Sequence, residues 1–278
     1  MKVNCRRFSK LSPFSPFQPG ARPIQILQQI DVSYFIVVVF LAVAIGAFVK
    51  GVTGVGLPIV SVPVMAVVLG VEHAVAVMII PSFTANISMV WMLRREASAN
   101  GELAAFILLG AGGTVLGAWI LSTVDKEVMF LVMAIWVGTY LFIRTVRSET
   151  VISDPAGRKL APVIGFVAGI FQSATGLSFP VFGPYLQARK FGRDRFAFNA
   201  AALLMVFAFV QFISFTGFDL LSPTRIAEGL LAVVPMAIAL PLGIRAARHF
   251  NKQNFDRLIV GLLLITAIIL LLRGVSAI

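Results

Sequence analysis

An apolar stretch broken by glycine and proline is the feature that most constrains this chain. Residues 46–63, G-A-F-V-K-G-V-T-G-V-G-L-P-I-V-S-V-P, have the apolarity of a membrane helix, yet they contain four glycines, two prolines and a lysine. Glycine in a helix interior costs about 1 kcal/mol relative to alanine, and proline removes a backbone hydrogen bond. We therefore expect two helical arms, at 32–49 and 51–71, with Lys50 and the glycine-rich turn at the tip of the hairpin between them.

A related stretch returns about 120 residues later, at residues 165–184, with the sequence G-F-V-A-G-I-F-Q-S-A-T-G-L-S-F-P-V-F-G-P. Its break is expected near Ala174–Gly176. Broken apolar segments at corresponding places in two halves of a chain are a sequence pointer to the substrate site of a membrane transporter. The duplication therefore predicts a transporter with broken helices.

Composition places the chain in a lipid bilayer. It is 59% hydrophobic and 13% charged, whereas soluble domains carry roughly 25% charged residues. Nine stretches carry no charged residue, and most approach the length of about 20 residues that a membrane-spanning helix needs. These stretches are 32–49, 51–71, 74–93, 103–124, 128–143, 160–188, 196–218, 229–244 and 258–272.

The stretches predict an all-α polytopic membrane protein with two repeats, at 32–143 and 160–273. Each repeat has one Gly/Pro-broken helical hairpin, expected at 32–71 and 160–188, followed by three transmembrane helices. A hairpin returns to its own side, so each repeat makes a net odd number of crossings. Two such repeats in tandem face opposite ways, which predicts an inverted repeat with a binding site between the halves.

The net charge of +11 lies mainly in the loops and in a basic tail at 1–31, which we expect to be disordered. Cytoplasmic loops carry an excess of Lys and Arg. This rule assigns 144–159, the linker between the repeats, to the cytoplasm together with 189–195 and 245–257, and it puts Asp125 and Asp219 outside. We expect a multi-pass protein of the cell (inner) membrane that contacts anionic lipid and binds no nucleic acid.

Four segments resemble the TauE/SafE family of sulfite-exporter-like anion permeases. They are K-G-V-T-G-V-G-L-P-I-V-S-V-P at 50–63, L-G-V-E-H-A-V-A at 69–76, Q-S-A-T-G-L-S-F-P-V-F-G-P-Y-L at 172–186 and R-F-A-F-N-A-A-A-L-L-M at 195–205. The resemblance covers roughly residues 33–273. It implies transport of small sulfur-containing or carboxylated anions, such as sulfite or organosulfonates.

The chemistry of the breaks favours an anion independently of the family. A helix that restarts after a break presents N–H groups without intrahelical partners and about half a positive charge. We expect restarts at 57–70 and 177–186, each with glycine before it. The predicted substrate-binding residues are Lys50, Thr53, Gly54, Gly56, Asn86, Gln172, Ser173, Thr175 and Gly176.

Each of these residues also has a structural interpretation. The ammonium of Lys50 could extend to the membrane surface, the hydroxyls could bond a carbonyl of their own helix, and Asn86 could join two helices. The glycine patterns Gly110-Gly113-Gly117 and Gly165-Gly169 indicate close helix packing rather than function.

The nine stretches contain no Asp or Glu, and Cys5 is the single cysteine. Carriers of cations usually place carboxylates in the membrane. We therefore expect no metal site, no cofactor and no enzymatic activity. The alternatives are a carrier of a cation or neutral metabolite, a membrane-embedded enzyme and a non-transporting membrane subunit. The sequence leaves direction, energy coupling and a homo-oligomeric state open.

Overall fold

The computed structural model describes residues 32–53, 56–97, 101–145, 151–247 and 252–276. The tail at 1–31 and Gly54 lie outside these described residues. Within them the chain forms α-helices joined by short links, and no strand occurs. The helices are α2 (Val32–Thr53), α3 (Leu57–Leu69), α4 (Val71–Met92), α5 (Gly101–Thr123), α6 (Lys126–Thr145), α7 (Asp154–Thr175), α8 (Phe179–Ala188), α9 (Arg193–Gly217), α10 (Pro223–Ala246) and α11 (Lys252–Ser276), with a 3-10 turn, η1 (Arg94–Glu96).

The all-α membrane fold is confirmed by seven helices that are long and apolar enough to cross a bilayer. Large apolar side chains on these helices face outward, among them Leu41, Leu108 and Ile135. Such exposure suits contact with lipid rather than water. The candidate spans are Ile36–Thr53, Val71–Met92, Leu103–Thr123, Lys126–Ile143, Asp194–Gly217, Pro223–Ala246 and Arg257–Ser276.

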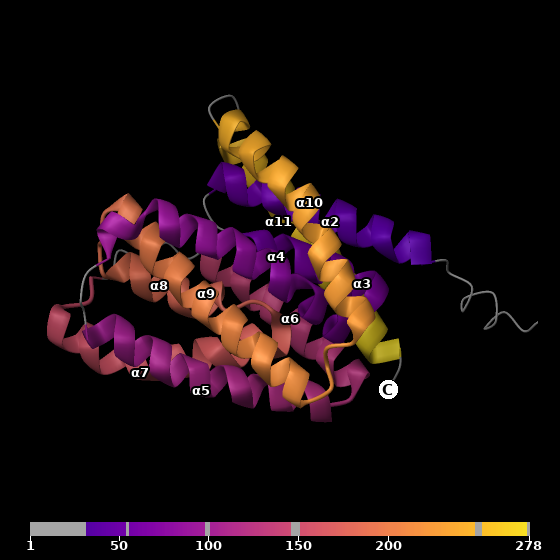
Figure 1. The fold of residues 1–278 in the computed structure, drawn as a ribbon, viewed down its shortest axis with the longest axis horizontal. Coiled ribbons are helices and arrows are strands. Elements are labelled where there is room, and N and C mark those ends of the chain that lie inside the picture. The colour runs from indigo at the N-terminus through magenta and orange to yellow at the C-terminus, as the bar shows by residue number, and fades with distance from the viewer. Residues whose placement is uncertain (1–31, 54–55, 98–100, 146–150, 248–251, 277–278) are drawn as a thin grey trace, which may run out of the picture.

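The helices repeat with a constant spacing. Four helices of the second half begin 122 residues after their counterparts, at Val32 and Asp154, Leu57 and Phe179, Val71 and Arg193, and Gly101 and Pro223. The contacts repeat as well, because α5 packs on α7 as α10 packs on α2, while α4 meets α9 and α6 meets α11 (Figure 1). These are the pairings expected when two similar units are related by a twofold axis.

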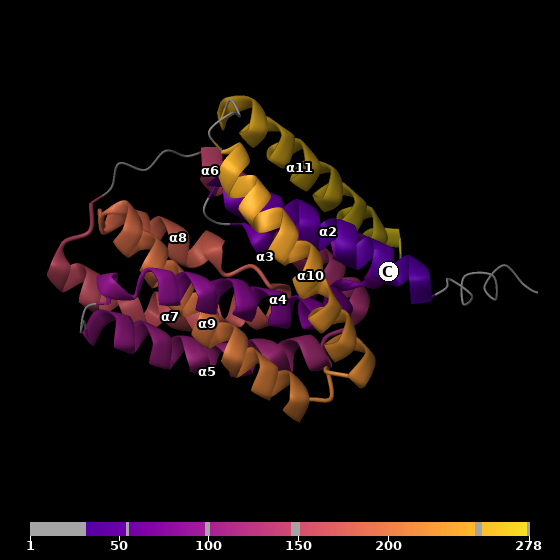
Figure 2. The same ribbon diagram turned by 45° about the horizontal axis from the view of Figure 1, so that its top comes forward.

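Counterpart helices also begin at opposite ends of the molecule. In Figure 2, α2 begins at the right-hand end and α7 at the left-hand end. This arrangement suits two units of opposite orientation. The inverted insertion of the halves into a membrane stays a prediction, as do the repeat boundaries. Helix α7 begins at Asp154, within the segment 144–159 that the sequence suggested as a linker.

The first break lies further along the chain than the sequence suggested. Helix α2 continues through Lys50 and Gly51 and ends at Thr53, so Lys50 belongs to the last turn of a helix and not to the tip of a hairpin. Helix α3 then begins at Leu57, as expected, after Gly56 with φ of 121°. A φ in this region favours glycine, because a side chain would clash with the backbone.

The second break lies where the sequence predicts it. Helix α7 ends at Thr175, and Gly176 adopts the left-handed conformation with φ of 72°. Left-handed glycine is the common terminator of a helix. Helix α8 begins at Phe179, two residues later than the predicted restart at Leu177, because Ser178 still occupies the N-cap position.

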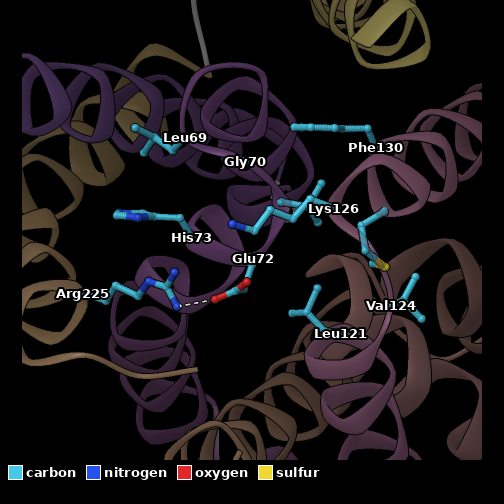
Figure 3. Close-up of a pocket in the computed structure, with 11 residues that line it drawn as sticks. Leu69, Gly70, Glu72, His73, Leu121, Val124, Lys126, Phe130 and Arg225 are labelled. Carbon is cyan, nitrogen blue, oxygen red and sulfur yellow. Dashed lines mark hydrogen bonds and ion pairs between the residues drawn. The ribbon is translucent and has the colours of Figure 1, made fainter. Parts of the chain in front are cut away.

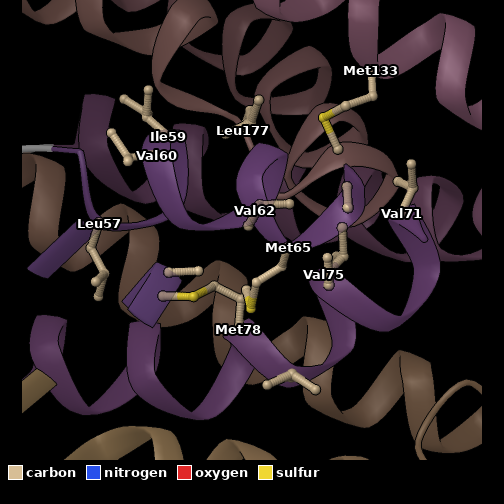
Figure 4. Packing of buried hydrophobic residues seen from close by; sticks show 14 of the residues in the cluster. Leu57, Ile59, Val60, Val62, Met65, Val71, Val75, Met78, Met133 and Leu177 are labelled. Atoms are coloured by element: carbon tan, nitrogen blue, oxygen red, sulfur yellow. The ribbon is translucent and has the colours of Figure 1, made fainter. Parts of the chain in front are cut away.

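The helices that follow the breaks are short. At 1.5 Å per residue, α3 is about 20 Å long and α8 about 15 Å, less than the hydrocarbon core of about 30 Å. Most of α3 is buried. Figure 4 shows Val62 and Met65 of α3 packed among Val75 of α4 and Leu177 of the second break. The short helix after the first break is therefore enclosed by protein.

Glycine seams join the two halves, as the glycine patterns predict. In α5, a Cβ at Gly113 or Gly117 would collide with the backbone of Phe166 or Ile170 in α7. Gly169 of α7 likewise lies against the backbone of Gly110. A smaller seam joins α2 to α10, where Gly51 and Gly243 face each other. Without side chains between them the helix backbones approach closely, which is typical of helix packing in membranes.

Candidate functional site

A cavity of about 230 Å³ lies beside the first break and is partly open. It is bounded by α2, α3 and α4 of the first half and by α8 and α9 of the second. The sequence predicts a substrate-binding site between the two halves, and residues of both halves line this cavity. Its lining residues are Lys50, Thr53, Gly56, Pro58, Asn86, Met89, Phe179, Gln187, Phe196, Ala197, Ala200, Ala201 and Leu204.

Lys50 supplies the one charged side chain in this lining. It is 6% exposed, and its Nζ donates to Oδ1 of Asn86 at 2.9 Å. The alternative that Lys50 extends to the membrane surface is therefore wrong. An ammonium has three donors, and no acid lies within ion-pair distance of Lys50 among the described residues. The cavity thus contains a buried positive charge without a carboxylate partner.

Asn86 holds this ammonium from α4. Its Nδ2 donates to the carbonyl oxygen of Ser82 at 2.8 Å, and its Oδ1 accepts from Lys50. The amide is 1% exposed. Its two contacts fix its orientation, so Asn86 both joins α2 to α4 and sets the position of the charge. The interpretation of Asn86 as a contact between helices is therefore confirmed, whereas its binding of substrate stays a prediction.

Thr53 and Gly56 lie where the cavity meets the break. The hydroxyl of Thr53 donates to the carbonyl oxygen of Val49 at 2.9 Å, which is the expected bond within its own helix. Gly56 precedes the first turn of α3. The leading N–H groups of a helix have no intrahelical partner and carry partial positive charge. The polar end of the cavity therefore combines the Lys50 ammonium with the beginning of a helix.

The residues of the second break do not line this cavity. Gln172, Ser173, Thr175 and Gly176 form a separate, buried group. The hydroxyl of Thr175 donates to the carbonyl oxygen of Phe171 at 2.7 Å, and Gly176 lies beside Val62 of α3. The Ser173 hydroxyl is buried without a partner among the described residues. The structure thus brings Lys50, Thr53, Gly56 and Asn86 together and sets the second group apart.

The two groups nevertheless join corresponding helices. Gln172 lies 122 residues after Lys50, and its Nε2 donates to Oε1 of Gln211 at 3.3 Å. Each bond joins the helix before a break to the third helix of the same repeat, α2 to α4 or α7 to α9. In the second half, Oε1 of Gln172 also accepts from the Ser178 hydroxyl at 2.6 Å. The two groups differ in their partners as well, because position 208, the counterpart of Asn86, is alanine, and in charge, because only the first contains a lysine.

A smaller pocket of about 110 Å³ lies at the other end of α4 (Figure 3). Arg225 of α10 donates to Oε1 of Glu72 at 2.6 Å. Beside it, Nε2 of His73 lies 2.5 Å from Oε2 of Glu228. Both pairs join α4 of the first half to α10 of the second. Glu72 and Asn86 are 14 positions apart on α4, which is about 20 Å along the helix, so this charged clamp is remote from Lys50.

Several lining residues have no distinct signal in the sequence. Phe179, Phe196 and Leu204 read as ordinary membrane side chains, and Gln187 ends an apolar stretch without any motif. Trp136 was also missed; its Nε1–H donates to the carbonyl oxygen of Leu177 at 2.7 Å, and its ring stacks on Phe171. Only the approach of α6, α8 and α9 to the breaks reveals these roles.

The described residues contain no group of three or more His, Cys, Asp or Glu that could hold a metal ion. The polar side chains that line the cavity are the ammonium of Lys50, the hydroxyl of Thr53 and the amides of Asn86 and Gln187. Such donors suit an anion rather than a cation, because cations require oxygen or other electron-rich ligands. This arrangement is chemically suited to the reversible binding of an anion.

Comparison with known protein families matches residues 38–270 to the family described as Sulfite exporter TauE/SafE. No curated protein and no solved structure matches the chain. The family match covers all of the described helices except the start of α2 and the end of α11. The chain therefore belongs to the TauE/SafE family of membrane transporters.

Proposed function

We propose that this multi-pass transporter carries a small anion, and that the anion binds in the cavity beside Lys50. The observation that carries the proposal is the buried ammonium without an acid partner among the described residues. A charge removed from water is costly unless it is paired. An anion in the cavity would pair it, and its departure would leave the amide of Asn86 to hold the ammonium.

In this proposal Lys50 supplies charge, Asn86 positions that charge, and Gly56 lets the anion approach the beginning of α3. Organosulfonate, sulfite and carboxylate oxygens all suit these donors. The hydroxyl of Thr53 already donates within its own helix, so Thr53 shapes the wall. Substrate contact by Gln172, Ser173, Thr175 and Gly176 stays a prediction for a conformation in which the second break faces the pathway.

We further propose an alternating-access mechanism. The cavity lies near Met89 and Gln187, beside the loops predicted to be cytoplasmic, whereas the Glu72–Arg225 and His73–Glu228 pairs close the halves at the other end. This combination supports an inward-facing state of a carrier in the cell (inner) membrane. Opening outward would require the clamp to separate.

The direct test is flux through the full chain in proteoliposomes loaded with a labelled organosulfonate. Lys50→Gln removes the charge and keeps a polar side chain of similar reach. We expect flux to fall about tenfold or more, since a hydrogen bond to a charged group is worth about 1.5–3 kcal/mol.

Lys159→Gln is the matched control, because Lys159 is exposed at the start of α7. It should transport like the wild type, and both variants should elute as monodisperse protein from gel filtration. Wild-type flux in Lys50→Gln, or flux of a cation in preference to the anion, would contradict the proposal.

A further inference from the structure

The cavity beside Lys50 has one charged end and an otherwise mainly apolar wall. Lys50 and Asn86 form the polar end, and Gln187 lies at the exposed rim. Helices α8 and α9 contribute two aromatic side chains to the lining, Phe179 and Phe196. Thr53 and Gly56 lie where the cavity meets the first break, and the remaining wall is made by Pro58, Met89, Ala197, Ala200, Ala201 and Leu204. An inorganic oxyanion would leave most of this apolar surface without contact.

The volume exceeds what a small oxyanion needs. A water molecule occupies about 30 Å³ in the liquid, and an apolar cavity of about 150 Å³ can hold benzene. The cavity has about 230 Å³. It therefore has room for a ring or a short hydrocarbon chain together with an anionic head group.

The charge of the site also sets the charge of its ligand. Lys50 is the one charged residue that lines the cavity, and the equivalent position of the second half holds the neutral Gln172. One ammonium can neutralise one negative charge. A dianion would keep a second charge among apolar side chains, which is costly without a partner.

We propose that the preferred substrate is an organic monoanion with an apolar body, a sulfonate or carboxylate whose head binds Lys50 and whose body lies against Phe179 and Phe196. This inference rests on the proposed function and narrows its substrate class. Sulfite and other inorganic oxyanions are then poor ligands, since they use only the polar end of the cavity.

Calorimetric titration of the purified full chain separates these classes, with benzenesulfonate, methanesulfonate and sulfite as the probes. Benzenesulfonate should bind about tenfold tighter than methanesulfonate or better, because each buried carbon adds apolar contact. Sulfite should bind no tighter than methanesulfonate. Benzoate tests the head group, and binding within tenfold of benzenesulfonate indicates that the site accepts either anionic head.

A filled-cavity variant tests the location. Ala197→Leu adds bulk to the apolar wall, and we expect it to weaken benzenesulfonate at least fivefold more than methanesulfonate. Ala104→Leu makes the same substitution at an exposed position of α5 and should leave both affinities at the wild-type value. Equal losses for both sulfonates in Ala197→Leu would contradict binding of the body at this wall.

The outcomes distinguish the two proposals. Sulfite or methanesulfonate binding as tightly as benzenesulfonate overturns the inference about the apolar body and leaves anion transport standing. Absence of binding by every anion overturns both.

Discussion

Single side chains decide the electrostatics of this transporter. Lys50 is bonded to an amide and not to a carboxylate, which would neutralise its charge. The Lys50 Nζ donates to Oδ1 of Asn86 in α4 at 2.9 Å. An amide oxygen orients the ammonium and leaves its charge in place. In the second half Gln172 occupies the position equivalent to Lys50, and its side chain bonds Gln211 of α9, so this link between helices carries no charge. The two half-sites therefore differ in charge, because lysine in the first half is replaced by glutamine in the second.

The pairing of Lys50 with an amide gives a sharp prediction. Asn86→Asp keeps the shape of the side chain and adds a negative charge beside the ammonium. The resulting ion pair satisfies Lys50 and repels an incoming anion. We expect anion affinity to fall about tenfold or more, since a hydrogen-bonded charge contact is worth about 1.5–3 kcal/mol.

The measurement is calorimetric binding of benzenesulfonate to Asn86→Asp, with gel filtration as the check of fold. Asn86→Ala is the companion variant, because it removes the positioning bond without adding charge. It should bind more weakly than wild type and more tightly than Asn86→Asp. Wild-type affinity in Asn86→Asp would mean that Lys50 is not the group that binds the anion.

At the scale of helices, the glycine seams determine which elements move together. Gly113, Gly117 and Gly169 let α5 and α7 approach with backbone against backbone. Interlocked backbones resist sliding, because any shift brings side chains into the seam. The seam thus fixes α7, the helix before the second break, to a helix of the first half.

A pair of valine variants on α5 tests the seam. In Gly117→Val the new side chain would collide with the backbone of Ile170, whereas in Gly112→Val it would meet open space. Overpacking of this kind costs about 1–3 kcal/mol. Gly117→Val should therefore lower the Tm of the detergent-solubilised protein, and Gly112→Val should remain close to wild type. Equal Tm values in the two variants would contradict a close seam at Gly117.

For the whole molecule, the inverted insertion of the halves makes a prediction about sidedness. Gly192 and Asp219 lie at the two ends of α9, and both are exposed. In a Cys5→Ser background, a cysteine at Gly192 should be protected from an impermeant thiol reagent added outside intact cells. A cysteine at Asp219 or Asp125 should be labelled. Similar labelling of Gly192 and Asp219 would rule out the predicted topology.

Local patterns predict much of the fold and less of the site. Gly176 ends a helix because of its own backbone freedom, so its break is visible in the sequence. The glycine spacing on α5 and α7 likewise predicts close packing. The continuation of α2 through Lys50 and Gly51 was missed, because packing against α10 offsets the poor helix propensity of glycine.

The cavity depends on distant residues instead. Asn86 is 36 positions from Lys50, and Phe196 comes from the other half of the chain. Periodicity within a helix shows which of its faces is apolar, but it does not show which face of another helix packs against it. The sequence therefore identifies Lys50 and Asn86 as candidates, whereas their bond and the aromatic wall of α8 and α9 require the assembled helices.

The seams have a mechanical consequence for the transport cycle. Helix α5 of the first half packs closely on α7 of the second, and α10 of the second half packs closely on α2 of the first. The two halves of the chain therefore cannot rock as separate bodies. We expect the four seam helices to act as a stationary frame. The elements that slide within it would be α3 and α8 with the crossing pair α4 and α9, which form the cavity walls other than the one that α2 supplies. The transporter would then work by an elevator-type mechanism, in which the sliding helices of both halves move together past the stationary frame.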